Sequence, residues 1–446
     1  MADLSINFAG IKAPNPFWLA SAPPTNSGYQ VMKAFDAGWG GAVWKTLGVP
    51  VVNVSSRYGS VNYRDTRMAG FSNIELISDR PLSANLREIE EVKKYFPGHA
   101  VIASLMVETR KEWEQIIRDV QNAGADGIEL NFGCPHGMCE RGMGSAVGQE
   151  PEVLKTIVGW VMDTAKIPVI TKLSPNISHI TDPGLAAVQG GTNAISLVNT
   201  FKSIVGIDLD TYAPYPLVDG KGTNGGYCGP AIKPIAMQMV RELAQHPEIA
   251  HVPISGIGGI ETWRDVVEFI LLGASSVQVC TAAMHYGFGI VREMEAGLQR
   301  FMQDKGFQTI YDFCGKALPN TTEWKRLNLH YKVVASIDPQ KCIGCQLCYI
   351  ACDDGAHQAI ALPTNAGRTP SIIEENCVGC NLCSLVCPVE QCITMVRKDD
   401  GQKHVSWEQR TLEHDIPVGF DDDRAGGLHH WVPEAKEGLG KWKMPI

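Results

Sequence analysis

The chain alternates short apolar runs, rich in β-branched residues, with longer stretches in which apolar residues recur at helical spacing. Eight apolar runs have the length of buried strands: Pro16 to Ala22, Ala42 to Leu47, Ala100 to Met106, Gly127 to Gly133, Ile167 to Ser174, Ala194 to Thr200, Val252 to Gly258 and Ser276 to Ala282. Between them, apolar residues three and four positions apart predict helices over residues 82–96, 110–122, 152–165, 233–245 and 263–272. Eight strand-and-helix units predict a parallel (β/α)8 or TIM barrel of the α/β class. An open doubly wound sheet is the alternative.

Polar residues gather where the predicted strands end, and active sites of such barrels lie at the carboxyl ends of the strands. The polar residues at the ends of the first six strands are Ser21, Lys45, Thr46, Asn131, Cys134, Lys172, Asn199 and Thr200. The seventh strand opens into a turn with Gly258 and Gly259, and the eighth ends near Cys280 and Thr281. Glycine amides before a helix predict a phosphate site here. The alternative is that the glycines only allow a tight turn between the strand and the helix.

Eight of the fourteen cysteines form two evenly spaced quartets near the C-terminus. Each quartet has the spacing C-x2-C-x2-C-x3-C, and Pro388 follows the second quartet where Asp353 follows the first. This spacing is typical of two-cluster bacterial ferredoxins, in which the fourth cysteine binds the other cluster. The predicted ligands of one [4Fe-4S] cluster are Cys342, Cys345, Cys348 and Cys387, and those of the second are Cys377, Cys380, Cys383 and Cys352. Structural zinc would explain a pair of C-x2-C motifs but not two quartets.

Iron–sulfur clusters pass single electrons, whereas most organic reductions need two. A cofactor that is stable after taking up one electron and after taking up two is therefore expected between the clusters and the substrate. Flavin mononucleotide (FMN) meets this need and carries one phosphate. A lysine near the flavin N1 and C2 carbonyl would stabilise the reduced ring, and Lys172 and secondarily Lys45 are the candidates. A strand-end lysine is otherwise an ordinary ion-pair partner.

The loop that starts at Asn131 contains a candidate proton donor. Cys134 stands among glycines and Pro135, and a thiol with an ordinary pKa of ~8.5 is mostly protonated near neutral pH. His136 is a rival acid in the same loop. The cysteines without regular spacing are interpreted as packing or incidental: Cys139, Cys228, Cys280, Cys314 and Cys392.

Composition and charge limit the possible partners. The 446 residues carry a formal charge of -9, which argues against binding to a nucleic-acid backbone. We find neither a secretory leader nor an apolar run long enough to span a membrane, so we expect a cytoplasmic chain. The predicted domains are a barrel over residues 1–315, a linker over 316–335, a small α+β ferredoxin domain over 336–397 and a tail over 398–446. The long segment over residues 201–229 is expected to fold over the barrel mouth.

Several motifs together resemble the dihydropyrimidine dehydrogenases, and in particular the bacterial catalytic subunits that carry only the flavin barrel and the ferredoxin domain. They are Phe71-Ser72-Asn73-Ile74-Glu75-Leu76, Asn131-Phe132-Gly133-Cys134-Pro135-His136-Gly137-Met138, Glu140-Arg141-Gly142-Met143-Gly144, Lys172-Leu173-Ser174-Pro175-Asn176 and the double cysteine motif. The similarity runs from Asp3 to about Arg397. It implies reduction of uracil and thymine at the C5=C6 bond, with hydride from flavin N5 to C6 and a proton from the loop cysteine to C5.

The resemblance also implies roles for individual residues. The acid is Cys134, and the pyrimidine-binding residues are Asn73, Asn131, Asn199 and Thr200. The FMN-binding residues are Ser21, Lys45, Thr46, Lys172, Gly229, Gly258, Gly259, Cys280 and Thr281. Gly133 stands where the mammalian enzymes have serine, which puts one substrate hydrogen bond in doubt. Amide side chains suit a pyrimidine because each offers a donor and an acceptor to its alternating N–H and C=O groups.

Electrons must come from a partner, because the chain has no second glycine-rich fingerprint for a nicotinamide cofactor. The resemblance implies an NADH-oxidising flavoprotein subunit, in a heterotetramer with two copies of each chain, and a reaction that runs close to reversible. Three alternatives remain open. They are a dihydroorotate dehydrogenase, a flavin-free barrel whose loop cysteine attacks a nucleotide as in IMP dehydrogenase, and a ferredoxin-type electron carrier whose barrel only docks partners.

Overall fold

The computed structural model describes residues 2–48, 53–134, 142–363, 367–399 and 401–413. It divides into two compact units, Met1–Asn320 and Thr321–Ile446, which are described separately below. This division falls within the predicted linker over residues 316–335. Within the described residues, no helix has both the length and the apolar character needed to span a bilayer.

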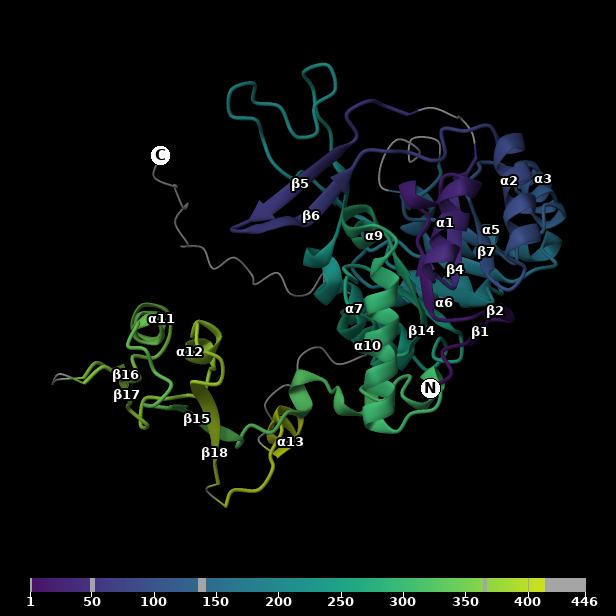
Figure 1. The fold of residues 1–446 in the computed structure, drawn as a ribbon. Coiled ribbons are helices and arrows are strands. Elements are labelled where there is room, and N and C mark those ends of the chain that lie inside the picture. Colours follow the sequence, from purple (N-terminus) through teal and green to yellow (C-terminus); the bar gives the residue numbers. More distant parts are fainter. Residues whose placement is uncertain (1, 49–52, 135–141, 364–366, 400, 414–446) are drawn as a thin grey trace, which may run out of the picture. The chain divides into compact units, whose positions relative to one another are not determined.

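The first unit is built around a closed barrel of parallel strands (Figure 1). Its strands are β3 (Phe17–Leu19), β4 (Gly41–Leu47), β7 (Ala100–Leu105), β8 (Gly127–Asn131), β9 (Val169–Lys172), β10 (Ala194–Leu197), β13 (Ile254–Ile257) and β14 (Ala274–Val279). Each strand pairs with the next in chain order, and β14 pairs with β3 to close the barrel. Every predicted apolar run overlaps one of these strands, so the TIM barrel is confirmed and the open sheet is wrong.

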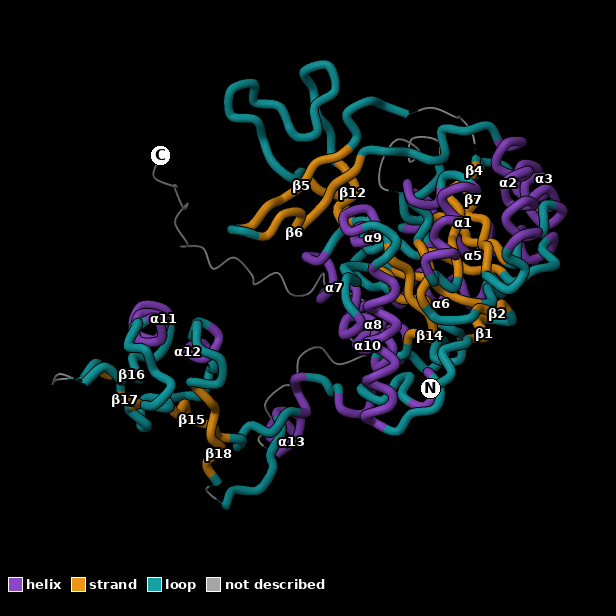
Figure 2. Tube along the Cα trace, in the orientation of Figure 1, coloured by secondary structure: helices purple, strands orange, loops and turns teal. Residues whose placement is uncertain are grey.

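Helices cover the outside of the barrel strands (Figure 2). They are α1 (Gly28–Ala37), α2 (Leu82–Tyr95), α3 (Arg110–Asn122), α4 (Ser145–Gly148), α5 (Pro151–Thr164), α6 (Thr181–Gln189), α7 (Lys233–Gln245), α8 (Trp263–Leu271), α9 (Thr281–Tyr286) and α10 (Ile290–Lys305). In α3, Trp113, Ile116, Ile117 and Val120 are buried at spacings of three and four residues. Thr109 and Glu112 begin this helix with a capping box, which satisfies amides that have no partner inside the helix.

The inside of the barrel contains buried polar side chains beneath the carboxyl ends of the strands. Ser104, Glu129, Ser196, Ser255, Ser276 and Gln278 are all at most 1% exposed. Gln278 Nε2 donates to Glu129 Oε2 over 2.8 Å, although β14 and β8 are not neighbours in the barrel. This hydrogen bond therefore crosses the barrel interior.

Two small antiparallel sheets accompany the barrel. A hairpin of β1 (Ile6–Phe8) and β2 (Ile11–Ala13) lies near the N-terminus. A four-stranded sheet contains, in spatial order, β11 (Phe201–Ser203), β12 (Gly225–Cys228), β6 (Thr66–Asn73) and β5 (Tyr58–Tyr63). The segment predicted to fold over the mouth thus supplies two strands, β11 and β12, to a sheet. Thr200 just before the segment and Gly229 at its end line a pocket of the barrel unit.

The second unit contains both cysteine quartets. The strands β15 (Lys332–Ile337) and β18 (Ile393–Lys398) pair along six residues, and β16 (Ile360–Ala361) pairs with β17 (Ser371–Ile372). The helices α11 (Leu347–Gly355) and α12 (Leu382–Leu385) each follow the first two cysteines of a quartet. Helix α13 (Trp407–Glu413) ends the described chain, and Trp407 packs on Trp324 with ring centroids 6.4 Å apart.

Candidate active site and cluster sites

A pocket of about 970 Å³, which includes space open to solvent, lies at the carboxyl ends of the barrel strands. It brings together all the residues that the sequence assigned to acid, substrate and FMN. These are Ser21, Lys45, Thr46, Asn73, Cys134, Asn131, Lys172, Asn199, Thr200, Gly229, Gly258, Gly259, Cys280 and Thr281. Their individual roles stay predictions, and their convergence on one cavity supports a common ligand site.

Two amide side chains of the pocket, those of Asn131 and Asn199, are held by hydrogen bonds to each other and to neighbouring residues. Asn131 Nδ2 donates to Thr46 Oγ1 over 3.0 Å, and Asn199 Nδ2 donates to Asn131 Oδ1 over 2.9 Å. Thr46 Oγ1 also lies 3.1 Å from Ser21 Oγ, and Asn199 Oδ1 accepts from the Thr200 amide at 2.8 Å. These bonds fix which edge of each amide faces the cavity. The pocket therefore presents amide groups in defined orientations.

Both candidate lysines are buried and ion-paired. Lys45 Nζ lies 2.6 Å from Glu75 Oε2, and Lys172 Nζ lies 3.3 Å from Glu129 Oε1. The ordinary ion-pair interpretation of a strand-end lysine thus holds for both, and both also line the pocket. Sequence reasoning gave no role to either carboxylate. The available signal was a charged residue inside an apolar run, as Glu129 is in Gly127 to Gly133.

Cys134 lies just after β8 and is buried, with Ile77, Met106 and Met143 around it. Its carbonyl oxygen accepts from the Ser145 amide at 3.0 Å, which fixes the backbone at the thiol. The rival acid His136 and the incidental Cys139 lie outside the described residues.

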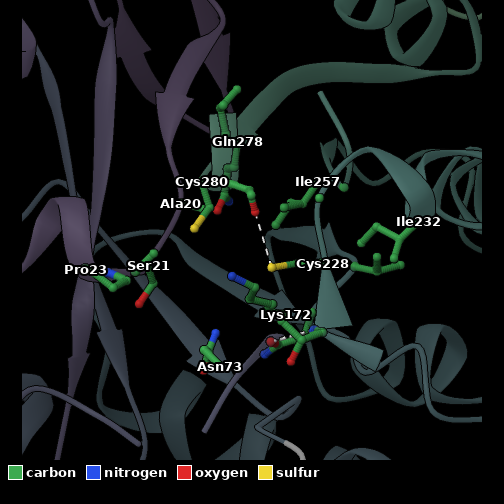
Figure 3. Close-up of a pocket in the computed structure, with 18 of the residues that line it drawn as sticks. Ala20, Ser21, Pro23, Asn73, Lys172, Cys228, Ile232, Ile257, Gln278 and Cys280 are labelled. Atoms are coloured by element: carbon green, nitrogen blue, oxygen red, sulfur yellow. Dashed lines mark hydrogen bonds between the residues drawn. The ribbon is translucent and has the colours of Figure 1, made fainter. Parts of the chain in front are cut away.

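Two cysteines without regular spacing line the pocket: Cys228, interpreted from the sequence as a packing residue, and Cys280, for which the resemblance also implied a place beside FMN. The Thr281 hydroxyl donates to Cys228 Sγ over 3.2 Å, and Figure 3 shows this contact beside Lys172. Burial raises the pKa of Cys228 to about 12. Burial likewise raises the pKa of Cys280 to about 11. Both thiols therefore stay neutral at physiological pH.

Two features of the pocket suit FMN. Gly229, Gly258 and Gly259 have φ of 93°, 131° and 69°, and a Cβ on Gly259 would come within 3.0 Å of the Gly229 carbonyl oxygen. Only glycine fits this turn, and its bare backbone allows close approach of a phosphate. Gln278 lines the pocket, and its buried Oε1 has no hydrogen-bond partner among the described residues, which leaves an unsatisfied acceptor beside the cavity.

Each of two cavities in the second unit is lined by the first three cysteines of one quartet and by the fourth cysteine of the other. Cys342, Cys345, Cys348 and Cys387 line one cavity of about 320 Å³. Cys352, Cys377, Cys380 and Cys383 line another of about 350 Å³. The two cavities thus contain the two ligand sets predicted for [4Fe-4S] clusters. Cys392, predicted to be incidental, is 2% exposed and also lines the first cavity.

Comparison with known proteins separates the possible families. Residues 3–302 match the family model described as dihydroorotate dehydrogenase, and residues 335–395 match the model of a 4Fe-4S dicluster domain. The chain is 44% identical over 359 residues to the NAD-dependent dihydropyrimidine dehydrogenase subunit PreA of Escherichia coli, covering 80% of this chain and 87% of that protein. The chain belongs to the dihydropyrimidine dehydrogenase family. FMN and two [4Fe-4S] clusters are the cofactors of such a chain, which confirms both predictions.

Other members and relatives support this placement. The chloroplastic dihydropyrimidine dehydrogenase (NADP(+)) of Arabidopsis thaliana is 44% identical over 329 residues, which cover 71% of this chain and 77% of that protein. The catalytic subunit of dihydroorotate dehydrogenase B of Thermococcus kodakarensis is 36% identical over 326 residues, 71% of this chain and 99% of that protein. The dihydropyrimidine dehydrogenase family makes the chain an oxidoreductase, and the word subunit in the PreA name points to a partner chain.

Proposed function

We propose that this chain reduces uracil and thymine to 5,6-dihydropyrimidines, reversibly, at the barrel pocket. Electrons would come from NADH through a flavoprotein partner and then through both [4Fe-4S] clusters. The names of the dihydropyrimidine dehydrogenase relatives support the reaction, and the pairing of a barrel with two cluster cavities supports the electron route.

One observation carries the choice of substrate. Lys45 and Lys172 are the cations among the described residues that line the pocket, and each faces a carboxylate. A neutral pyrimidine can bind to Asn73, Asn131 and Asn199 without a charged partner. A substrate with its own carboxylate, such as orotate, would need a cation that these ion pairs do not leave free.

FMN would be held by Lys172, Gly258 and Gly259 together with the other predicted flavin residues, and when bound it supplies the hydride. Cys134 donates the proton to C5 of the pyrimidine from the loop that follows β8. Thr46 orients Asn131, and Asn131 orients Asn199, so the substrate edge is read by amides that cannot rotate freely. The burial of Cys134 among Ile77, Met106 and Met143 keeps water away from the thiol.

The clusters and the partner complete the proposal. The exchange of Cys352 and Cys387 between the two cavities supports two neighbouring clusters, which suits a short path for single electrons. We place the chain in the cytoplasm, where NADH is available, in a heterotetramer with two copies of each subunit.

Turnover of the Cys134→Ala variant tests this function, with Cys314→Ala as a control. Cys314 belongs to the barrel unit and does not line the pocket. Cys134→Ala should keep FMN and clusters and slow uracil reduction by roughly 10²- to 10⁴-fold, the range for a lost general acid. Turnover equal to that of the control would transfer the acid role to another group such as His136.

Dihydroorotate is the second candidate substrate, because the barrel matches the dihydroorotate dehydrogenase model. Parallel assays with uracil and with dihydroorotate decide between them. Oxidation of dihydroorotate at a rate comparable to uracil turnover would overturn the argument from the paired lysines.

A further inference from the structure

A buried hydrogen-bonded group lies one layer below the pocket and is not used by the proposed reaction. Its centre is Glu129, which precedes Asn131 by two residues on β8 and is 0% exposed. Ser196 Oγ and Gln278 Nε2 both donate to Glu129 Oε2, each over 2.8 Å. These donors come from β10 and β14, so three strands hold one carboxylate inside the barrel.

Lys172 connects this group to the pocket. Its Nζ lies 3.3 Å from Glu129 Oε1 in an ion pair, but Oε1 has no well-aligned hydrogen bond among the described residues. The ammonium is thus attracted to the carboxylate by charge without a hydrogen bond to Oε1, so its N–H groups are available to other acceptors. Figure 3 shows the Lys172 side chain extending among the residues that line the pocket.

We infer that Glu129, held by Ser196 and Gln278, is a positioning residue that fixes Lys172 and offsets its positive charge toward the ring bound in the pocket. The inference rests on the proposed function, in which Lys172 faces FMN. Ser196 and Gln278 are neutral, so Lys172 is the one cation among the described contacts of Glu129. A carboxylate this close cancels much of the field of an ammonium when both groups are buried, as Glu129 and Lys172 are.

The consequence is a ring that takes up negative charge less readily. With Lys172 alone, a reduced and anionic ring would be stabilised strongly and would hold its electrons. With Glu129 behind Lys172, the stabilisation is smaller, which suits a reaction that runs close to reversible. Gln278 belongs to both regions, because its Nε2 donates to Glu129 and the residue also lines the pocket.

Sulfite binding to the flavin of the purified full-length chain tests this inference. Sulfite adds to oxidised flavin and leaves negative charge on the ring, so its dissociation constant reports the local positive field. Glu129→Gln should tighten sulfite binding by roughly tenfold or more, since a full negative charge is removed next to Lys172. The readout is the bleaching of the flavin band and needs neither substrate nor partner.

Asp126→Asn is the matched control. Asp126 immediately precedes β8 at its amino end and is ion-paired to Lys93 over 2.7 Å, so this change removes a paired carboxylate away from the pocket. It should leave sulfite binding unchanged. If Glu129→Gln fails to fold, Glu129→Asp keeps the charge and should bind sulfite within roughly twofold of the wild type; tenfold tightening in Glu129→Asp would overturn the inference.

The remaining outcomes separate this inference from the proposed function. A Glu129→Gln chain that binds FMN with unchanged sulfite affinity would overturn the role of Glu129 alone. A wild-type chain that binds no FMN would overturn the proposed function and this inference together.

Discussion

The Glu75→Gln substitution tests how much the second buried ion pair contributes to stability. Glu75 Oε2 lies 2.6 Å from Lys45 Nζ, and Glu75 Oε1 lies 2.8 Å from Arg57. The side chains of Lys45 and Glu75 are 5% and 6% exposed, whereas that of Arg57 is 29% exposed. Neutralising Glu75 therefore leaves one buried cation without a counter-charge, while Arg57 keeps Asp79.

The magnitude follows from this burial. Breaking a buried ion pair costs about 3–5 kcal/mol, and the low end applies here because glutamine retains a hydrogen-bond acceptor for Lys45. A loss of about 3 kcal/mol in the free energy of unfolding corresponds to a fall in melting temperature of roughly 6 °C for a large domain.

Thermal unfolding of the FMN-loaded chain provides the assay, and Asp79→Asn is the control. Asp79 pairs with the same Arg57 over 3.3 Å but is 34% exposed, so its loss should cost less than about 1 kcal/mol. A second readout is Tyr58, whose pKa is raised to about 12 by burial and by Glu75. In Glu75→Gln this pKa should fall. Unchanged melting and an unchanged tyrosine titration would refute the reasoning.

Two more predictions concern the cysteines. Cys387→Ser should remove about half of the bound iron, whereas Cys392→Ser, in the same cavity, should keep it all; equal iron in both variants would contradict the ligand assignment. Burial raises the pKa of Cys228 to about 12 and that of Cys280 to about 11. The stability that their neutral thiols contribute is fully present below the ordinary value near 9 and is lost as pH rises through 11 to 12. Between pH 9 and 11, the melting temperature of the double variant Cys228→Ala/Cys280→Ala should therefore fall less than that of the wild type. An equal fall in both proteins would contradict this prediction.

The barrel could be predicted because its signal is local and repeated. Each barrel strand is an apolar run bounded by turns, and fully buried parallel strands need no long-range information to be recognised. The four-stranded sheet could not be predicted in this way. Its strand β12 is Gly225–Cys228, with two glycines and little β propensity, and it pairs with Asn73 and its neighbours about 150 residues away.

The pocket could be predicted for similar reasons, but the residues that hold it could not. Residues at the ends of parallel strands must meet at one edge of the barrel, so the sequence order of Asn131 and Lys172 already places them together. Glu129 and Gln278 instead meet across the barrel interior, and that contact depends on how the strands close. A single charged residue in an apolar run indicates such a partner without identifying it.

The exchange of Cys352 and Cys387 makes the two halves of the second unit dependent on each other. Since each cavity takes three thiols from one quartet and one from the other, neither half has a complete binding site by itself. A cluster bound in either cavity would therefore tie the two quartets together. Oxidative loss of one cubane should leave the other bound but interrupt the path for electrons, so damage at one centre should stop electron transfer through both.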